Sequence, residues 1–287
     1  MSDLDCSVSA LYVHPIKSCA GIPVNDSLLI ETGLEFDRAW MVVDASGQML
    51  TQRELPRLAL IRPQLRSEDM ILRAPGMLAL HIALDRVETA TRVRVWDDEV
   101  AAFEMGALAA QWFSDFLGRR DGGLLRLVRF DPEQRRLSNR QWTGEVEAEN
   151  AFADAFPLLV TSTASHADLN TRLAERGIAP IGIERFRPNL VLEGLQAFDE
   201  DHIDELTITT DDGPVRLKLV KPCVRCTIPN VDPATGVAGH EPGDTLAGFR
   251  ADARMNGGIT FGMNAMVLEG NERTLRVGQK AQASWRF

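Results

Sequence analysis

Residues 211–236, DDGPVRLKLVKPCVRCTIPNVDPATG, combine a turn, a strand and a pair of cysteines. The Asp-Asp-Gly-Pro sequence at 211–214 is typical of a hairpin turn between predicted strands at 205–209 and 215–220. Pro229 and Pro233 follow the cysteines and disfavour a helix there. The segment therefore predicts a β-hairpin whose second strand leads into a Cys-x-x-Cys and a proline-rich turn.

The Cys-x-x-Cys of Cys223 and Cys226 has several interpretations. A structural zinc site needs four ligands, but there is no second pair, and His240 lies beyond the proline-rich turn. A thioredoxin-like dithiol normally opens a helix near a βαβ unit, unlike this pair. Two small buried thiols are a third interpretation. The fourth is a single thiolate that ligates a redox metal, with Arg225 beside Cys226 favouring the thiolate.

Short predicted strands, punctuated by Gly and Pro, extend outward from this hairpin. They lie at 8–13, 39–44, 92–96, 124–130, 156–161, 190–192, 263–268 and 279–285. Two helices are expected, one over 106–118 that ends at Gly118 and one with Ser165 as its N-cap that ends at Gly177. The pattern predicts a strand-rich α+β fold of two β-barrel-like domains with a few helices.

The stretch 131–149 is polar and interrupts the run of predicted strands. It predicts a linker or long loop between a first domain, 1–130, and a second domain, 150–287.

Composition narrows the function. With 31 basic and 41 acidic residues the net charge is −10, which argues against nucleic-acid binding. No apolar run approaches the roughly 18–20 residues of a membrane span. The N-terminus lacks the basic and apolar regions of a signal peptide, so a cytoplasmic location is expected. Four cysteines are too few for a disulfide-stapled scaffold of 287 residues.

Two further loops are candidates for anion binding. In residues 12–24, YVHPIKSCAGIPV, a strand ends at a proline and the next turn presents Lys17 and Ser18, which suits a phosphate. The alternative is a solvated hairpin turn. In residues 184–190, ERFRPNL, Pro188 is expected to hold Arg187 extended, and Asn189 offers donors and acceptors suited to a heterocycle edge. The alternative is a surface loop that leads into a strand.

Taken together, these segments resemble the MOSC superfamily, in particular the two-part proteins with an N-terminal MOSC barrel. That group includes the mitochondrial amidoxime-reducing component and its bacterial relatives. The resemblance runs in order along nearly the whole chain, through HPIKSC with Gly21 (14–21), DRAW (37–40), QRELPRL (52–58), ADLN (167–170), RFRPN (185–189), 223–236 and FG (261–262).

The resemblance implies a molybdopterin-type cofactor whose molybdenum takes one protein ligand, the second cysteine of the pair, Cys226. Cys223 is then structural. Positions that match contacts to the pterin or its phosphate are Lys17, Ser18, Arg38, Ser162, Arg187, Asn189 and Arg225. Asp232, six residues after Cys226, is a candidate for proton handling.

Two positions depart from the family pattern. Val224 replaces a serine of many relatives, and Met263 replaces a glutamine. Both changes are expected to alter contacts to the cofactor or the substrate preference.

The resemblance implies an oxidoreductase that reduces N-hydroxylated compounds. Two alternatives stay open: a persulfide carrier for metal-cluster assembly and a non-catalytic cofactor-binding module. The four cysteines lack the spacing of an iron–sulfur cluster, and no nucleotide-binding glycine motif follows a strand. Electrons are therefore expected from a separate iron–sulfur, flavin or haem protein that meets a basic patch at the pocket mouth.

Overall fold

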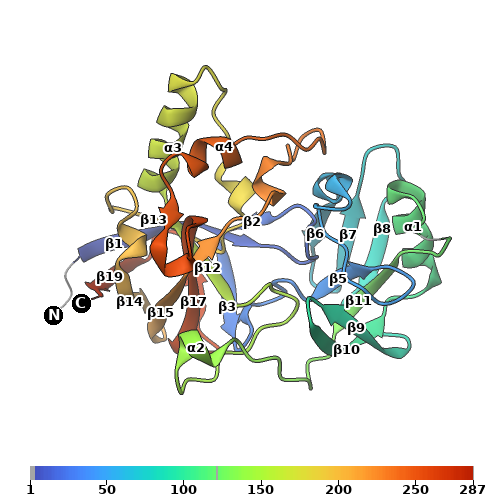
Figure 1. Cartoon of the computed structure of the whole chain (residues 1–287). Coiled ribbons are helices and arrows are strands. Elements are labelled where there is room, and N and C mark those ends of the chain that lie inside the picture. Colours follow the sequence, from blue (N-terminus) through green and yellow to red (C-terminus); the bar gives the residue numbers. More distant parts are fainter. Residues whose placement is uncertain (1–3, 121, 287) are drawn as a thin grey trace.

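A computed structural model describes residues 4–120 and 122–286 of the chain (Figure 1). The fold is strand-rich α+β, as predicted, with one strand-rich body at each end of the view. Residues 1–3, on which part of the signal-peptide argument rests, lie outside the described residues.

Seven strands close into a ring in the part of the chain that the model describes. Adjacent strands are antiparallel, except that β12 and β13 are parallel, and pairing of β12 with β17 closes the ring. The order around the ring is β12 (Leu158–Ser162), β13 (Leu190–Glu193), β1 (Leu4–Val13), β19 (Lys280–Trp285), β14 (Ile203–Thr210), β15 (Gly213–Val224) and β17 (Gly258–Glu269). Two short strands extend it, β2 (Ile22–Val24) beside β1 and β16 (Ala251–Asp252) beside β17.

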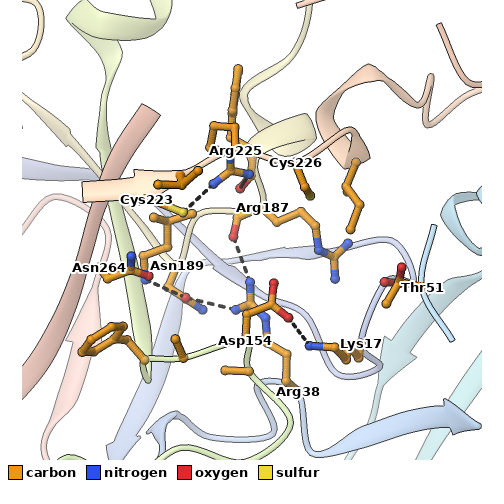
Figure 2. A pocket seen from close by; sticks show the side chains of 18 of the residues that line it. Lys17, Arg38, Thr51, Asp154, Arg187, Asn189, Cys223, Arg225, Cys226 and Asn264 are labelled. Atoms are coloured by element: carbon orange, nitrogen blue, oxygen red, sulfur yellow. Dashed lines mark hydrogen bonds and ion pairs between the residues drawn. The ribbon is translucent and has the colours of Figure 1, made fainter. Parts of the chain in front are cut away.

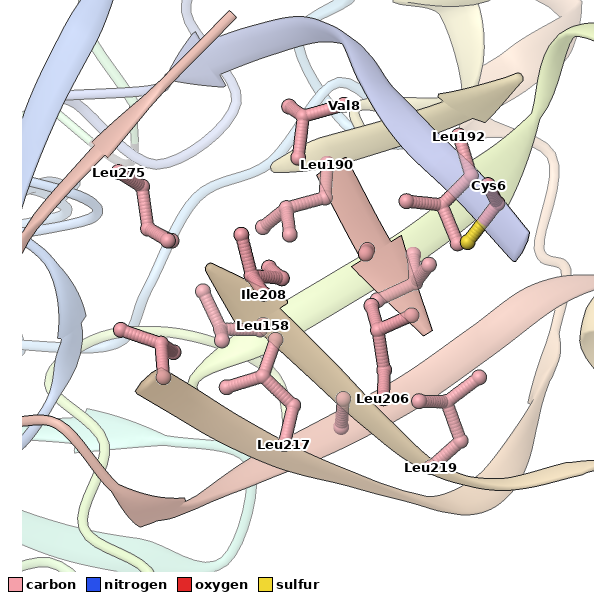
Figure 3. Close-up of a cluster of buried hydrophobic side chains, with 14 of the residues drawn as sticks. Cys6, Val8, Leu158, Leu190, Leu192, Leu206, Ile208, Leu217, Leu219 and Leu275 are labelled. Carbon is pink, nitrogen blue, oxygen red and sulfur yellow. The ribbon is translucent and has the colours of Figure 1, made fainter. Parts of the chain in front are cut away.

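The predicted hairpin at 211–214 is confirmed, because Thr210 pairs with Gly213 and Leu206 with Leu217. Alternate side chains are buried along 206–208 of β14 and 215–219 of β15, and Leu206, Ile208, Leu217 and Leu219 have no exposed surface. Figure 3 shows these side chains meeting residues of β1 and β13 in the barrel core. Burying one such side chain stabilises the fold by about 1.5–3 kcal/mol.

Most of the first half forms two smaller sheets and a helix around a second core. Helix α1 (Ala107–Leu117) packs Trp112, Phe113 and Phe116 into this core and ends at Gly118, as predicted. The sheets are β5 (Trp40–Val43), β11 (Arg126–Phe130), β10 (Asp98–Glu104) and β9 (Ala90–Val95), and β6 (Arg62–Leu65), β7 (Asp69–Arg73) and β8 (Leu80–Ala83). A third small sheet joins β18 (Thr274–Arg276), β3 (Asp26–Ile30) and β4 (Gly33–Leu34).

The sheets do not follow the expected division into residues 1–130, 131–149 and 150–287. Strand β1 belongs to the ring of the second half, because its alternating apolar side chains fill the barrel between β13 and β19. Conversely, strand β18 comes from the second half of the chain but pairs with β3 of the first half. Residues 131–149 are also partly ordered, with helix α2 (Arg140–Thr143) and a bridge between Leu137 and Glu149.

Helix α3 (Thr163–Glu175) begins earlier than predicted. Its N-cap is Ser162, whose Oγ accepts a hydrogen bond from the backbone N–H of Ser165 at 3.1 Å. Strand β12 leads directly into the helix, so the first of the two serines takes the capping position. The remaining short helices are η1 (Pro56–Leu60), η2 (Ile183–Phe186), η3 (Asp199–Asp201), η4 (Ile228–Asn230), α4 (Gly243–Ala247) and η5 (Ala253–Met255).

Candidate functional site

A cavity lies where the loop after β15 meets turns of the first half (Figure 2). The turn after β1 contributes Lys17 and Ser18, and the turn before β5 contributes Arg38. The second half contributes Arg187 and Asn189 after η2, and Arg225 and Cys226 after β15. The structure thus brings seven of the nine predicted site residues together.

Positive charge dominates the wall of this cavity. Five cationic side chains line it: Lys17, Arg38, Arg53, Arg187 and Arg225. Among the described lining residues, Asp154 is the one acid. Because the whole chain carries a charge of −10, this local excess of cations marks a site for an anion.

Lys17 lines the cavity and is buried, with 5% of its surface exposed. Its ammonium donates to the Phe152 carbonyl at 2.8 Å and pairs with Asp154. Burial lowers the pKa of Lys17, and the charge of Asp154 partly offsets that effect. The alternative of a solvated hairpin turn is therefore wrong for this loop.

Arg38 is held in place by the second half of the chain. Its guanidinium donates to Asn189 Oδ1 at 3.0 Å and to the Arg187 carbonyl at 2.9 Å, and it pairs with Asp37. Asn189 Oδ1 also accepts from the Leu159 N–H at 3.1 Å, and its Nδ2 donates to the Tyr12 carbonyl at 3.2 Å. Asn189 therefore joins elements of both halves and positions Arg38.

Arg187 departs from its predicted conformation. Its backbone is left-handed (φ 58°, ψ 46°) rather than extended, because it ends η2. One guanidinium nitrogen donates to the Cys19 carbonyl, and the buried Nη2 has no partner among the described residues. Burial, followed by the charge of Arg38, lowers the pKa of Arg187 to about 10.

Three residues of the cavity wall share an uncommon backbone conformation. Ser18, Arg38 and Arg187 have positive φ angles of 67°, 50° and 58°. Such a conformation costs free energy in residues other than glycine and persists where the surrounding structure holds it. His14 lies between these turns, where its Nε2 contacts the Pro188 carbonyl at 3.0 Å and its backbone carbonyl accepts from the Arg38 N–H.

The two cysteines of the pair differ in their surroundings. Cys226 is exposed at the cavity, whereas Cys223 is half-buried. Arg225 donates to Cys223 Sγ at 2.9 Å and to the Phe186 carbonyl at 2.9 Å, so its contact is with Cys223 rather than with Cys226. The described residues contain no cluster of three or more potential metal ligands, and a metal held by one thiolate remains compatible with this geometry.

Two predicted site residues lie elsewhere. Ser162 is fully buried, where it caps α3 and donates to Glu200 Oε2 at 2.9 Å. Asp232 closes the turn after η4, because its side chain accepts from the Ala234 N–H at 2.8 Å. Local backbone groups bind both side chains, and neither residue lines the cavity.

Several lining residues were missed as site residues. Asp154 follows the polar stretch that was predicted as a linker, and Asn264 lies on β17 and donates to the Lys221 carbonyl at 3.2 Å. Thr51 lies directly before the QRELPRL segment, which was the one available signal, and Arg53 of that segment was expected only as one of several cations of a basic pocket.

The two departures from the family pattern differ in consequence. Val224 lines the cavity and is 45% exposed, so its side chain does face the site. Met263 is fully buried in the barrel core and does not line the cavity, so its expected effect on the cofactor is not supported by its position.

The barrel and its cation-lined cavity define a class of two-part strand-rich proteins. Residues 5–120 match the family model of the MOSC N-terminal beta barrel domain, and residues 147–282 match that of the MOSC domain. The chain therefore belongs to the family of MOSC proteins with an N-terminal MOSC barrel.

Within this family the chain is similar to the amidoxime-reducing components. It is 36% identical over 255 residues to mitochondrial amidoxime reducing component 2 of Rattus norvegicus, which covers 85% of this chain and 72% of the relative. It is 35% identical over 285 residues to mitochondrial amidoxime-reducing component 1 of Mus musculus, covering 95% and 80%. It is also 32% identical to the molybdenum cofactor sulfurase of Homo sapiens, covering 90% of this chain and 30% of the relative.

These relatives correct the expected location. The expectation of a cytoplasmic protein rested on the absence of a visible signal peptide, yet the amidoxime-reducing relatives are named as mitochondrial components. The cytoplasmic prediction is therefore wrong by this comparison. Within the described residues, none of the helices has the length and apolar character required to span a membrane.

Proposed function

We propose that the cavity binds a molybdopterin-type cofactor and that the protein reduces N-hydroxylated compounds. One observation carries the proposal: an exposed thiol, Cys226, borders a cavity with five cations and one acid. A soft thiolate suits a redox metal, and the cations suit the phosphate of a pterin cofactor. The names of the amidoxime-reducing relatives support the reduction, and the name of the related molybdenum cofactor sulfurase supports the cofactor.

The hydrogen-bonding groups of the cavity fit an anionic cofactor. Arg187 Nη2 and Arg225 Nε are buried and have no partner among the described residues. An unpaired buried donor costs about 1–3 kcal/mol, which oxygen atoms of a bound anion would offset. Lys17, Ser18 and Arg187 would hold the phosphate, and Cys226 would hold the metal.

When bound, the molybdenum of such a cofactor supplies the two-electron chemistry of oxygen removal. The net reaction consumes two electrons and two protons, converts an N–OH group to N–H and releases water. The chain itself would anchor the phosphate, supply one thiolate and leave the metal accessible to the substrate. The hydrogen bonds of Asn189 and Asp37 keep Arg38 oriented during these tasks.

We also propose that a separate iron–sulfur, flavin or haem protein supplies the electrons. All four cysteines are free thiols; Cys6 and Cys19 are buried and belong to different apolar cores. The cysteines therefore do not form a cluster that could store electrons. The cations near the mouth, including Arg53, favour a donor with an acidic surface.

The test is metal analysis and pterin fluorescence of natively purified protein, followed by turnover of benzamidoxime with reduced viologen. Stoichiometric molybdenum, pterin and turnover support the proposal. Persulfide on Cys226 without molybdenum would favour a sulfur carrier. Molybdenum and pterin without single-turnover reduction would favour a binding module, and either result contradicts the proposed enzyme.

A further inference from the structure

A second pocket adjoins the cation-lined cavity. It shares Arg225 and Cys226 with that cavity, and no residue of the first half lines it. The other six lining residues are Thr227, Pro229, Asn230, Gly243, Leu246 and Ile259. We call this the side pocket; η4, α4 and β17 surround it.

The side pocket differs chemically from the cation-lined cavity. Pro229, Leu246 and Ile259 give it apolar walls. Both terminal nitrogens of Arg225 are already bound, to Cys223 and to the Phe186 carbonyl, so Arg225 offers no free guanidinium end here. The pocket therefore suits an uncharged and largely apolar group rather than an anion.

Asn230 provides a directional polar group in this pocket. Its Oδ1 accepts from the Gly243 N–H at 2.9 Å, which fixes the orientation of the amide. Its Nδ2 has no hydrogen-bond partner among the described residues and is not buried. It is therefore available to an acceptor on a molecule bound in the pocket. A few placed polar groups among apolar walls are typical of small-molecule sites.

We propose that the side pocket binds the apolar body of the substrate while its N–OH group lies beside Cys226. This inference rests on the proposed function and adds a recognition site to it: the side pocket and Asn230 select, among N-hydroxylated compounds, uncharged ones that carry a small aromatic or aliphatic group. An acceptor next to the substrate's body, such as the oxime nitrogen of an amidoxime, which hydroxylamine lacks, receives a hydrogen bond from Asn230 Nδ2. Because Cys226 borders both spaces, one molecule can occupy the side pocket and reach the metal held by that thiolate.

The test compares two substrates. Benzamidoxime carries an aromatic ring that would occupy the side pocket, and hydroxylamine carries no such group. Asn230→Asp keeps the acceptor for the Gly243 N–H and replaces the donor with an anionic oxygen. Its ratio of kcat/KM for benzamidoxime over hydroxylamine should fall about tenfold, as expected for the loss of one hydrogen bond. Asn271→Asp, on the exposed turn before β18, is the matched control and should leave the ratio unchanged.

A second variant narrows the pocket without changing charge. A Cβ at Gly243 would lie 2.8 Å from Asn230 Nδ2, so Gly243→Ala displaces the amide. The ratio of kcat/KM for benzamidoxime over hydroxylamine should also fall in Gly243→Ala. Equal effects on both substrates, or none, in Asn230→Asp and Gly243→Ala would overturn the inference.

A measurement of substrate binding that needs no turnover tests this inference separately from the proposed function. Saturation-transfer NMR of benzamidoxime with the purified protein should show contact in the wild type and a reduced signal in Asn230→Asp. If the wild type reduces neither substrate, the proposed function fails, and the NMR comparison alone decides the side pocket. An unchanged NMR signal in Asn230→Asp would overturn the site even if turnover is present.

Discussion

Arg225 donates its hydrogen bond to Cys223 Sγ, at 2.9 Å, and leaves the thiol of Cys226 exposed at the cavity. The pair therefore divides two tasks between two cysteines. Cys223 accepts from Arg225 and helps to fix that side chain, whose other end holds the Phe186 carbonyl. Cys226 remains available to a ligand.

This division predicts different outcomes for two serine variants. Cys226→Ser removes the soft ligand and should abolish molybdenum retention. Cys223→Ser keeps an acceptor for Arg225 and should retain metal, with turnover reduced less than about tenfold, because the hydrogen bond is weakened rather than lost. Molybdenum per chain, measured by mass spectrometry on both proteins, checks this. Retention in Cys226→Ser together with loss in Cys223→Ser would reverse the assignment.

Lys17→Met should weaken cofactor retention about ten- to a hundredfold, because one charge-assisted contact contributes about 1.5–3 kcal/mol. The substitution keeps the length of the side chain, and Asp154, whose side chain is 56% exposed, stays solvated without its partner. Pterin content after extended dialysis is the measurement. Lys280→Met, at an exposed position on β19, is the control. Equal retention by the two variants would remove Lys17 from the anion site.

Ser162→Ala should destabilise the fold by about 1 kcal/mol or more, because it removes the N-cap of α3 and a hydrogen bond to buried Glu200. Urea denaturation measures the free energy of unfolding. Cofactor content should stay unchanged, since Ser162 does not line the cavity. A loss of cofactor at normal stability would restore the contact that the family resemblance implied.

Glu200 predicts a pH dependence of stability. Burial raises the pKa of this carboxyl to about 7, from 4.5, despite hydrogen bonds from Ser165 and Ser162. The folded state therefore binds a proton more tightly than the unfolded state, and this contribution to stability is lost as pH rises from about 4.5 to 7. In Glu200→Gln the decrease in stability between about pH 4.5 and 7 should disappear, as measured by thermal unfolding at several pH values.

The buried His14 changes stability in the opposite direction as pH varies, so its contribution must be separated from that of Glu200. Burial, followed by the charges of Arg38 and Arg187, holds the pKa of His14 well below 6.5. Its contribution is therefore lost as pH falls below 6.5. The difference between wild type and Glu200→Gln isolates the carboxyl, and an unchanged slope in the variant would show that Glu200 stays ionised in the folded protein.

The proposed donor requirement predicts no steady turnover with NADH or NADPH as the sole reductant. The four cysteines lie as free thiols, and the cavity wall carries no nucleotide-binding glycine loop among its described residues. Turnover should appear with reduced viologen or an added iron–sulfur, flavin or haem protein, and an oxygen-free spectrophotometric assay checks this. Sustained NADH oxidation by the purified chain alone would contradict the requirement.

Local patterns predicted the seven strands of the ring, three strands of the first half and the two longest helices, but missed β2, β3, β4, β6, β7, β8, β10, β16 and β18. The hairpin at 211–214, helix α1 with its glycine end and the alternating strands follow from periodicity and turn chemistry. Strand partners do not follow from such patterns, because they depend on contacts between distant residues. The placement of β1 between β13 and β19 and of β18 beside β3 was therefore not predicted.

The site was predicted mainly through the order of its motifs. Lys17, Arg38, Arg187 and Cys226 lie in recognisable segments, and the fold brings them together. Ser162 shows the limit of this reasoning, since a hydroxyl in a matching position can cap a helix instead of facing a ligand. Asp154 shows the converse, because a single acid between apolar residues (AFADAF, 151–156) gives no local sign of the lysine that it meets.

The position of β1 has a consequence for how the protein is made. Its residues are synthesised long before those of its partner β19, although Leu4 of β1 pairs with Ala283 of β19. Contacts this distant in sequence form slowly, because a long loop must close first. Lys17 and Cys226 are also far apart in the sequence, so the cavity is complete only when both segments have been synthesised and have folded together. A fragment that ends before Cys226 should therefore be unable to retain the cofactor.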